Sequence, residues 1–172
     1  MNLKTLVRDI PDFPKPGVVF KDITPVLADP GALRWVVDSL AERYRGRVDA
    51  VVGIESRGFI AGAPVAYALD VGLVVVRKPG KLPHETHSVS YELEYGSDSL
   101  EIHTDAVAEG ARVVVVDDLL ATGGTARATV DLVERVGARV VECAFIIELA
   151  FLGGAAKLAP MSTFALATYD AE

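Results

Sequence analysis

The apolar residues of the chain fall into short unbroken runs, and the stretches between these runs have helical periodicity. Such runs are typical of parallel strands that are buried on both faces. The predicted strands span residues 49–54, 72–76, 113–116, 139–147 and 160–168, and the predicted helices span 29–44, 59–69, 126–136 and 153–158. This alternation predicts an α/β fold with an open, doubly wound, mainly parallel sheet and right-handed crossovers.

The remaining segments lack this pattern. Residues 3–10 have the spacing of a short amphipathic helix, residues 11–17 must turn because they contain three prolines, and 18–20 read as a short strand. Residues 82–99 are polar, with rough alternation over 89–95 and 100–103, which predicts a hairpin that turns through 96–98. A loop of this length is usually functional, so we expect a mobile lid over about 80–100.

The most informative stretch is 113–125, VVVVDDLLATGGT. Four valines predict a buried strand that stops at Asp117 and Asp118, and a loop with two glycines then leads into a helix. Main-chain N–H groups and threonine hydroxyls in such a loop, together with the helix N-terminus, favour a phosphate. The two carboxylates need another partner on the same ligand, and a ribose diol can donate to both. The stretch therefore predicts a phosphoribosyl site.

Two further loops follow predicted strands and should face the same crevice, because the carboxyl ends of parallel strands meet at one edge of the sheet. Glu55 to Gly58 carries Arg57, and the segment after residue 76 carries Arg77, Lys78 and Lys81. Several cations at one sheet edge suit a polyanion such as pyrophosphate. The chain contains neither GxxxxGK[ST] nor a GxGxxG after a strand, so P-loop and dinucleotide sites are excluded.

The 113–125 stretch resembles the signature for 5-phosphoribosyl-1-pyrophosphate (PRPP) of the type I phosphoribosyltransferases. Further segments along nearly the whole chain resemble the adenine phosphoribosyltransferase family; they are DFPKPG at 12–17, VFKD at 19–22, ESRGF at 55–59, RK at 77–78, GKLP at 80–83, and SY at 90–91 with LEYG at 93–96. The resemblance implies the type I fold, with a small hood formed by residues 1–30 and 148–172. It also implies purine salvage, in which adenine and PRPP give AMP and pyrophosphate.

The family resemblance also implies residue roles for PRPP. The 5′-phosphate would lie on Ala121, Thr122, Gly123, Gly124 and Thr125, and the pyrophosphate on Ser56, Arg57, Arg77, Lys78 and Lys81. Asp117 and Asp118 would hold the ribose diol. Mg²⁺ would be bound with PRPP, and no protein side chain would be its direct ligand.

The remaining implied roles concern adenine and the proton that it loses. The lid would bring Glu94 and Tyr95 over the sugar, with Glu94 as the general acid/base and Asp117 as the fallback. Adenine would meet main-chain groups of Val19 and Lys21, and its ring would lie between the side chains of Phe20 and Leu149. Many family members have Arg where this chain has Lys21, which leaves a backbone role there but puts a side-chain role in doubt.

Composition narrows the picture further. A chain of 172 residues without linkers or repeats predicts one domain, 1–172. The net charge of −7 disfavours a nucleic-acid partner, and no apolar run is long enough for a membrane span. The hydrophobic share of 51% and mean hydropathy of +0.33 favour a buried interface, as in the homodimers common in the family. With one cysteine and no apolar leader at the N-terminus, we expect a cytoplasmic protein.

Two alternatives stay open. The first is a phosphoribosyltransferase for guanine, xanthine or hypoxanthine, in which Lys21 would donate to the 6-oxo group. The second is a non-catalytic PRPP-sensing regulator, which would bind PRPP without turnover and would not need to retain Glu94.

Overall fold

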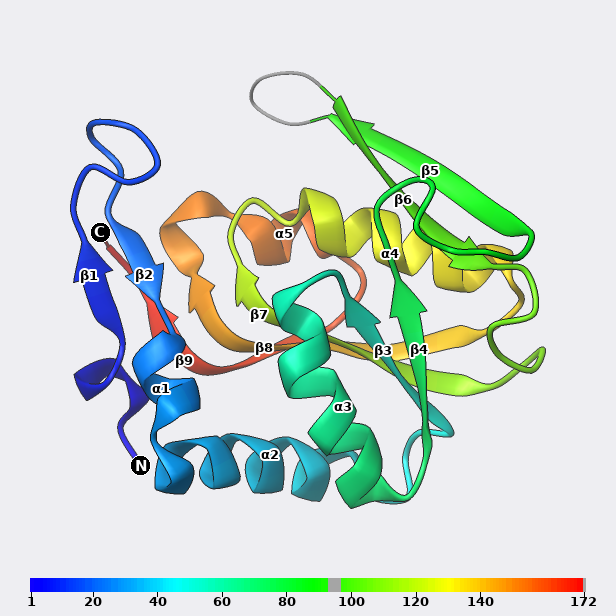
Figure 1. Cartoon of the computed structure of the whole chain (residues 1–172), viewed down its shortest axis with the longest axis horizontal. Helices are drawn as coiled ribbons and strands as arrows, with labels where there is room; N and C mark the ends of the chain where they lie inside the picture. The colour runs from blue at the N-terminus through cyan, green and yellow to red at the C-terminus, as the bar shows by residue number, and fades with distance from the viewer. Residues whose placement is uncertain (93–96, 172) are drawn as a thin grey trace.

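The computed structural model describes residues 1–92 and 97–171, and its centre is a parallel sheet with the strand order β4-β3-β7-β8-β9 (Figure 1). The strands of this sheet are β3 (Ala50–Ile54), β4 (Gly72–Val76), β7 (Arg112–Leu120), β8 (Arg139–Leu149) and β9 (Thr163–Tyr169). All four neighbouring pairs are parallel. The predicted strands are therefore confirmed, with shifted ends.

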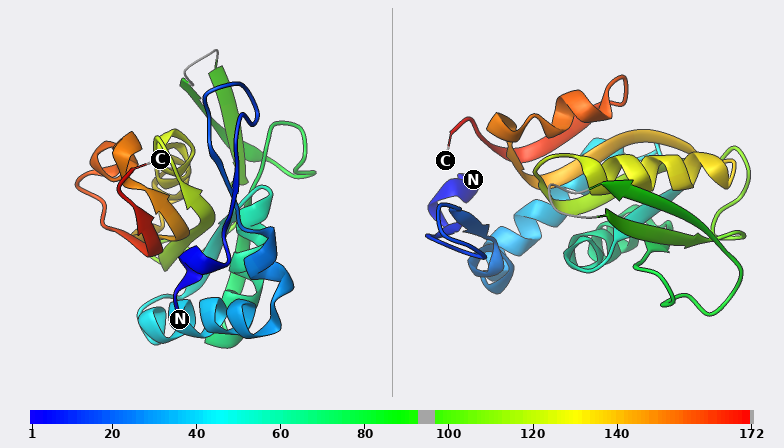
Figure 2. Two further views of the ribbon diagram at one scale, coloured as in Figure 1. Left: turned by 90° about the vertical axis from the view of Figure 1, so that its left-hand side faces the viewer. Right: turned by 90° about the horizontal axis from the view of Figure 1, so that it is seen from above.

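Helices cover both faces of the sheet (Figure 2). The helices α2 (Pro30–Tyr44) and α3 (Arg57–Leu69) pack on one face, and α4 (Gly124–Arg135) and α5 (Gly154–Leu158) pack on the other. Strand β7 contributes to both cores, because Val113 and Val115 face α4 whereas Val114 and Val116 face α3. This arrangement confirms the doubly wound α/β fold and explains why the run of valines has no polar position.

The long helix α2 begins and ends at identifiable contacts. The carboxylate of Asp29 accepts the N–H of Ala32 at 2.7 Å, and Pro30 occupies the first turn, as the sequence predicted. At the other end, Arg43 forms a two-pronged ion pair with buried Glu142 of β8, at 2.7 and 3.0 Å. The hydroxyl of Tyr44 donates to the same carboxylate at 2.6 Å. These contacts fix α2 to the sheet.

The N-terminal segment corrects two predictions. Residues 3–10 do not form one helix, because a 3-10 turn η1 (Leu3–Thr5) precedes a strand β1 (Arg8–Ile10). The predicted strand 18–20 is instead β2 (Phe20–Asp22), which pairs antiparallel with β1 and leads into α1 (Thr24–Ala28). Residues 8–10 form a strand because β2 supplies hydrogen-bond partners for their backbone, and the spacing of apolar residues over 3–10 gives no sign of this pairing.

The N-terminal segment lies beside the last strand, β9. The ammonium groups of Lys4 and Lys21 lie over the Tyr169 ring, 5.0 and 4.9 Å from its centroid. A second 3-10 turn, η2 (Ala150–Leu152), follows β8. The predicted hood of 1–30 and 148–172 remains a prediction, although β9 belongs to the central sheet rather than to a separate unit.

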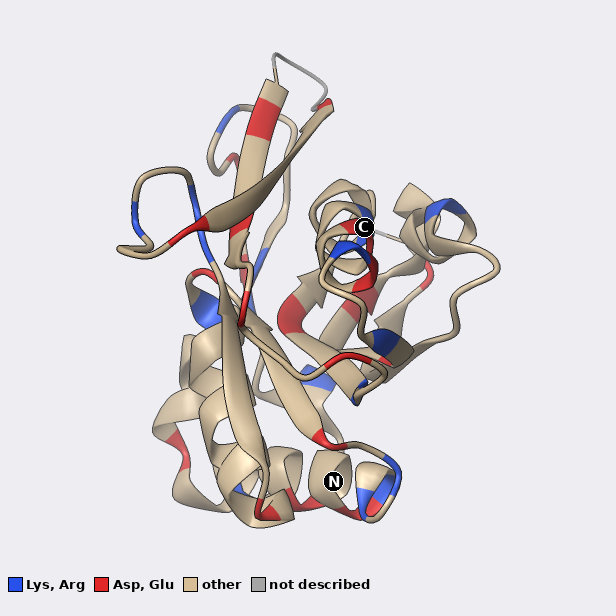
Figure 3. Ribbon diagram, turned by 90° about the vertical axis from the view of Figure 1, so that its right-hand side faces the viewer, with Lys and Arg blue, Asp and Glu red and all other residues tan. Residues whose placement is uncertain are grey.

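The predicted lid contains an antiparallel hairpin of β5 (Thr86–Glu92) and β6 (Ser97–His103), which projects beyond the sheet (Figure 3). Ser97 and Asp98 belong to β6 and not to the turn, since they pair with Glu92 and Tyr91. Leu100 and Ile102 are fully buried in the α4-side core, which anchors the base of the hairpin. The mobility of the lid stays a prediction.

Strand β7 is longer than the sequence indicated. The predicted strand stopped at the two carboxylates, but β7 continues to Leu120 because β8 extends beside it, with Asp117 opposite Phe145 and Leu120 opposite Glu148.

Within residues 1–92 and 97–171, no helix is long and apolar enough to cross a membrane.

Candidate active site

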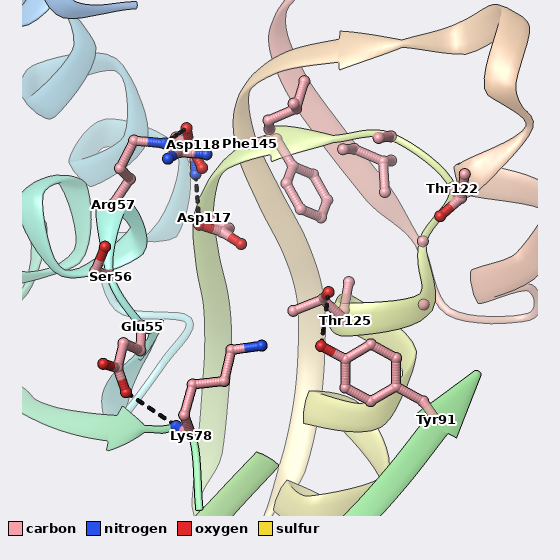
Figure 4. A pocket seen from close by; sticks show the side chains of 16 residues that line it. Glu55, Ser56, Arg57, Lys78, Tyr91, Asp117, Asp118, Thr122, Thr125 and Phe145 are labelled. Atoms are coloured by element: carbon pink, nitrogen blue, oxygen red, sulfur yellow. Dashed lines mark hydrogen bonds and ion pairs between the residues drawn. The ribbon is translucent and has the colours of Figure 1, made fainter. Parts of the chain in front are cut away.

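A cavity of about 340 Å³ opens at the carboxyl ends of β3 and β7, where the sequence placed the crevice (Figure 4). It is lined by Glu55, Ser56, Arg57, Lys78, Tyr91, Asp117, Asp118, Leu119, Leu120, Ala121, Thr122, Gly123, Gly124, Thr125, Ala126 and Phe145. The structure thus brings together both predicted carboxylates, the whole phosphate loop and three of the predicted pyrophosphate residues.

The phosphate loop 121–125 turns sharply from β7 into α4. Gly123 has a φ of +80°, which residues with a side chain rarely adopt, and a Cβ there would lie 2.6 Å from the carbonyl oxygen of Gly154. The loop therefore packs directly on the start of α5, and α4 begins at Gly124 with its N-terminal end at the cavity. A loop of this shape presents N–H groups and a helix N-terminus to an anion.

The two carboxylates occupy different surroundings. Asp117 faces the cavity, and its Oδ1 accepts the N–H of Asp118 at 2.8 Å (Figure 4). Asp118 is buried, and its Oδ2 accepts from Nε of Arg57. Burial, reinforced by the neighbouring charge of Asp118, raises the pKa of Asp117 well above its usual value. Asp118 is therefore held in an ion pair, while Asp117 keeps its proton to higher pH than a free aspartate does.

Glu55 contacts the basic residues that follow β4. Its carboxylate accepts from Nε and Nη2 of Arg77 at 3.2 and 3.3 Å, and from the N–H of Lys78 at 2.9 Å. The ammonium of Lys81 lies 3.8 Å from the same carboxylate. The hydrogen bond from Lys78 is the main cause that lowers the pKa of Glu55, so the group stays charged. Lys78 lines the cavity, whereas Arg77 and Lys81 contact Glu55 and are not among the lining residues.

The sequence predicted no site role for several residues that line the cavity, among them Glu55, Tyr91 and Phe145. Glu55 was noted only as part of its loop, and Phe145 only as part of a strand. Tyr91 was part of the predicted hairpin, and its alternation with polar neighbours places it on the inner face of β5. Its hydroxyl accepts a hydrogen bond from Thr125 Oγ1 at 3.2 Å. The alternation in the sequence could have identified Tyr91 as a residue that faces the cavity. The place of Glu55 became clear only from its contacts in the structure.

The predicted adenine residues lie outside the cavity lining. Phe20 and Lys21 are in β2 of the N-terminal hairpin, and Val19 immediately precedes it. The Phe20 ring meets Phe13 edge-on at 5.2 Å, and Lys21 pairs with Asp9 at 2.9 Å. Leu149 ends β8 and is buried. Their adenine roles stay predictions, and the predicted Glu94 and Tyr95 fall outside the described residues.

Among residues 1–92 and 97–171, no group of three or more His, Cys, Asp or Glu side chains is placed to hold a metal ion.

The cavity joins a glycine-rich loop at a helix N-terminus, an acidic strand end and basic residues from neighbouring strands, and residues 30–159 match the family model of the phosphoribosyl transferase domain. The chain belongs to this family, and within it to the adenine phosphoribosyltransferases. It is 58% identical over 168 residues to the adenine phosphoribosyltransferase of Geobacter metallireducens, which covers 97% of this chain and 98% of that protein. The family resemblance seen in the sequence is thus confirmed.

Solved structures agree. The adenine phosphoribosyltransferase of Thermoanaerobacter pseudethanolicus superposes with a TM-score of 0.94 at 55% identity, covering 97% of this chain and 98% of that one. The Saccharomyces cerevisiae enzyme, solved with an imino-altritol bisphosphate and adenine, gives a TM-score of 0.91 at 42% identity, covering 95% and 96% of the two chains. The type I fold predicted from the sequence is therefore confirmed.

Proposed function

We propose that this chain catalyses purine salvage: adenine attacks ribose C1 of PRPP, and the products are AMP and pyrophosphate. The observation that carries the proposal is the cavity of about 340 Å³, which is lined by the loop 121–125, by Asp117 and Asp118, and by the basic residues Arg57 and Lys78. These groups suit the 5′-phosphate, the ribose and the pyrophosphate of PRPP. The family to which the chain belongs supports adenine as the acceptor.

PRPP would lie across the cavity with its two ends on different loops. Residues 121–125 would hold the 5′-phosphate through main-chain N–H groups and threonine hydroxyls. Ser56, Arg57 and Lys78 would meet the pyrophosphate directly, and Arg77 and Lys81 would add positive charge beside Glu55. Asp117 and Asp118 would accept the ribose hydroxyls between these ends.

The chemistry separates charge, because the sugar becomes electron-poor while negative charge grows on the leaving pyrophosphate. Preset cations beside the leaving group and carboxylates beside the sugar stabilise both changes without reorganisation at the moment of reaction. Mg²⁺ bound with PRPP would neutralise part of the pyrophosphate charge. The site fits such an ion, since Mg²⁺ keeps several waters and is held largely through substrate phosphates.

The proton that adenine loses needs an acceptor near the reacting nitrogen. We assign this role to Glu94 of the lid, with Asp117 as the alternative. The raised pKa of Asp117 supports the alternative, because an acid/base group works best when its pKa approaches the working pH. Adenine itself would be read by main-chain groups of Val19 and Lys21, with Phe20 and Leu149 on the two sides of its ring.

The first test is pyrophosphate release with PRPP and Mg²⁺, with adenine, guanine, hypoxanthine and orotate offered in parallel. We expect a strong preference for adenine. Glu94→Gln should lower kcat about 100-fold or more while PRPP still binds, the usual size of a lost acid/base. Turnover with another base would overturn the adenine assignment, and PRPP binding without any turnover would identify a regulator.

We also propose that the active form is a homodimer in the cytoplasm. An exposed apolar stripe supports the dimer: Ile60 and Tyr67 of α3 are 48% and 89% exposed, and Leu73 of the edge strand β4 is 37% exposed. Exposed apolar residues that lie together mark contact surfaces. The location is supported by the substrate, because a polyanion such as PRPP crosses an apolar bilayer only at great cost.

A further inference from the structure

The carboxylate of Asp98 occupies a central place that none of the roles above uses. Asp98 lies near the start of β6, directly across from Tyr91 of β5. Its Oδ2 accepts from the ammonium of Lys78 and faces the Tyr91 hydroxyl, which donates to it at 3.3 Å. Its Oδ1 accepts the N–H of Ser99 at 2.8 Å. The side chain thus joins the lid hairpin to a cation of the pyrophosphate end.

Tyr91 extends this connection to the other end of the cavity. Its hydroxyl accepts from Oγ1 of Thr125 at 3.2 Å (Figure 4). Its ring lies against the phosphate loop, since a Cβ on Gly124 would be 3.4 Å from the ring carbon Cδ2. A continuous line of polar contacts therefore runs from Lys78 through Asp98 and Tyr91 to Thr125, and it links the two loops that would hold the two ends of PRPP.

We propose that Asp98 is a positioning residue for PRPP, which fixes the ammonium of Lys78 directly and, through Tyr91, holds the lid hairpin against the phosphate loop at Thr125. The proposal rests on the functions assigned above to Lys78 and to the loop 121–125. Lysine has a long flexible side chain, so holding it in place before the ligand arrives reduces the ordering that binding requires. An ammonium has three N–H donors, and the contact with Asp98 leaves donors free for a phosphate oxygen.

A different function for the same carboxylate makes the opposite prediction. If Asp98 competed with pyrophosphate for Lys78, removing its charge would free the lysine and tighten PRPP binding. If Asp98 positions Lys78, as we infer, Asp98→Asn weakens PRPP binding about ten-fold, the usual size of one hydrogen bond between charged groups. The kcat at saturating PRPP and the KM for adenine should change little by comparison.

The measurement is calorimetric titration of Mg²⁺ and PRPP into the full chain without base, together with steady-state kinetics. Asp105→Asn is the matched control, because it removes the same charge just beyond β6 from a side chain that is 72% exposed and faces His84 at 3.8 Å. The control should bind PRPP like the wild type. Tighter binding by Asp98→Asn, or equal weakening by Asp105→Asn, would overturn the proposal.

A double-mutant cycle with Lys78→Met separates positioning from general stability. Asp98→Asn should weaken PRPP binding in the wild type but have little further effect in the Lys78→Met protein. An equal loss in both backgrounds, accompanied by a lower Tm, would mean that Asp98 only stabilises the hairpin. If Lys78→Met weakens binding and Asp98→Asn does not, the proposal alone fails; if Lys78→Met binds normally, the assignment of Lys78 fails and the proposal falls with it.

Tyr91→Phe tests the contact between Tyr91 and Thr125 and preserves the packing of the fold, because it keeps the ring against Gly124. We expect a several-fold weaker PRPP affinity, and less than additive loss when it is combined with Asp98→Asn. Additive losses would show that the two side chains act separately and would contradict the connection to Thr125.

Discussion

At the scale of single residues, Asp117 carries a conflict between stability and function. Its pKa is raised, so between its usual value near 3.8 and the raised value the folded chain binds more protons than the unfolded chain. Stability must therefore fall as pH rises through this range. We predict that Asp117→Asn raises Tm near neutral pH by about 3 °C per kcal/mol recovered. The same change should lower kcat/KM about ten-fold or more, because an amide replaces the carboxyl group that would accept a ribose hydroxyl. Scanning calorimetry across pH and the pyrophosphate assay measure both.

Asp118→Asn is the matched control, since it also replaces one of the two carboxylates. It leaves the guanidinium of Arg57 without its partner, so Tm should not rise. A Tm of Asp117→Asn below that of the wild type would contradict the inference that the Asp117 carboxylate destabilises the fold. An unchanged activity would contradict its role in the reaction.

At the scale of elements, the sequence could predict what local pattern encodes. The valine run of β7, the capped start of α2 at Asp29 and the phosphate loop all have signals within a few residues, and all are where they were expected. The strand β1 was missed because its pairing with β2 depends on residues about twelve positions away. The contacts of Glu55 with the side chains of Arg77 and Lys81 and with the backbone N–H of Lys78 were also missed, since contacts between residues 22 to 26 positions apart leave no periodic trace.

The close approach of α3 to β7 sets the distance between the two sides of the cavity. A Cβ on Gly58 would lie 2.8 Å from the carbonyl oxygen of Val116 and 2.9 Å from Oδ1 of Asp117, so a side chain there would push the helix away. We predict that Gly58→Ala raises the KM for PRPP at least about ten-fold and lowers stability by about 1–3 kcal/mol, the usual cost of overpacking. Steady-state kinetics and urea unfolding measure the two effects.

Gly72→Ala serves as its control, because a Cβ at that position of β4 would have no atom within 4 Å. Its KM for PRPP and its unfolding midpoint should match the wild type. Normal KM in Gly58→Ala would show that the spacing of α3 and β7 tolerates a methyl group and would remove this explanation for the glycine.

At the scale of the whole molecule, the central sheet has one edge whose surroundings favour a second copy of the chain. Strand β4 ends the sheet on that side, and α3 beside it presents Ile60 and Tyr67 at helical spacing to solvent. The Leu73 side chain packs against α3, 3.4 Å from where a Cβ on Gly62 would lie, so α3 and the edge strand lie next to each other on this surface. A second copy would cover this surface and leave the cavity at the strand ends open.

We predict that the wild type elutes with twice the mass of the 18.3 kDa chain in light scattering coupled to gel filtration. Tyr67→Glu should give the single-chain mass, because a buried unpaired carboxylate at the interface costs several kcal/mol. Leu152→Glu is the control, since Leu152 of η2 is similarly exposed at 40% but belongs to another part of the fold, and it should remain dimeric. A wild type of single-chain mass would contradict the dimer, and dissociation by Leu152→Glu alone would move the interface to η2.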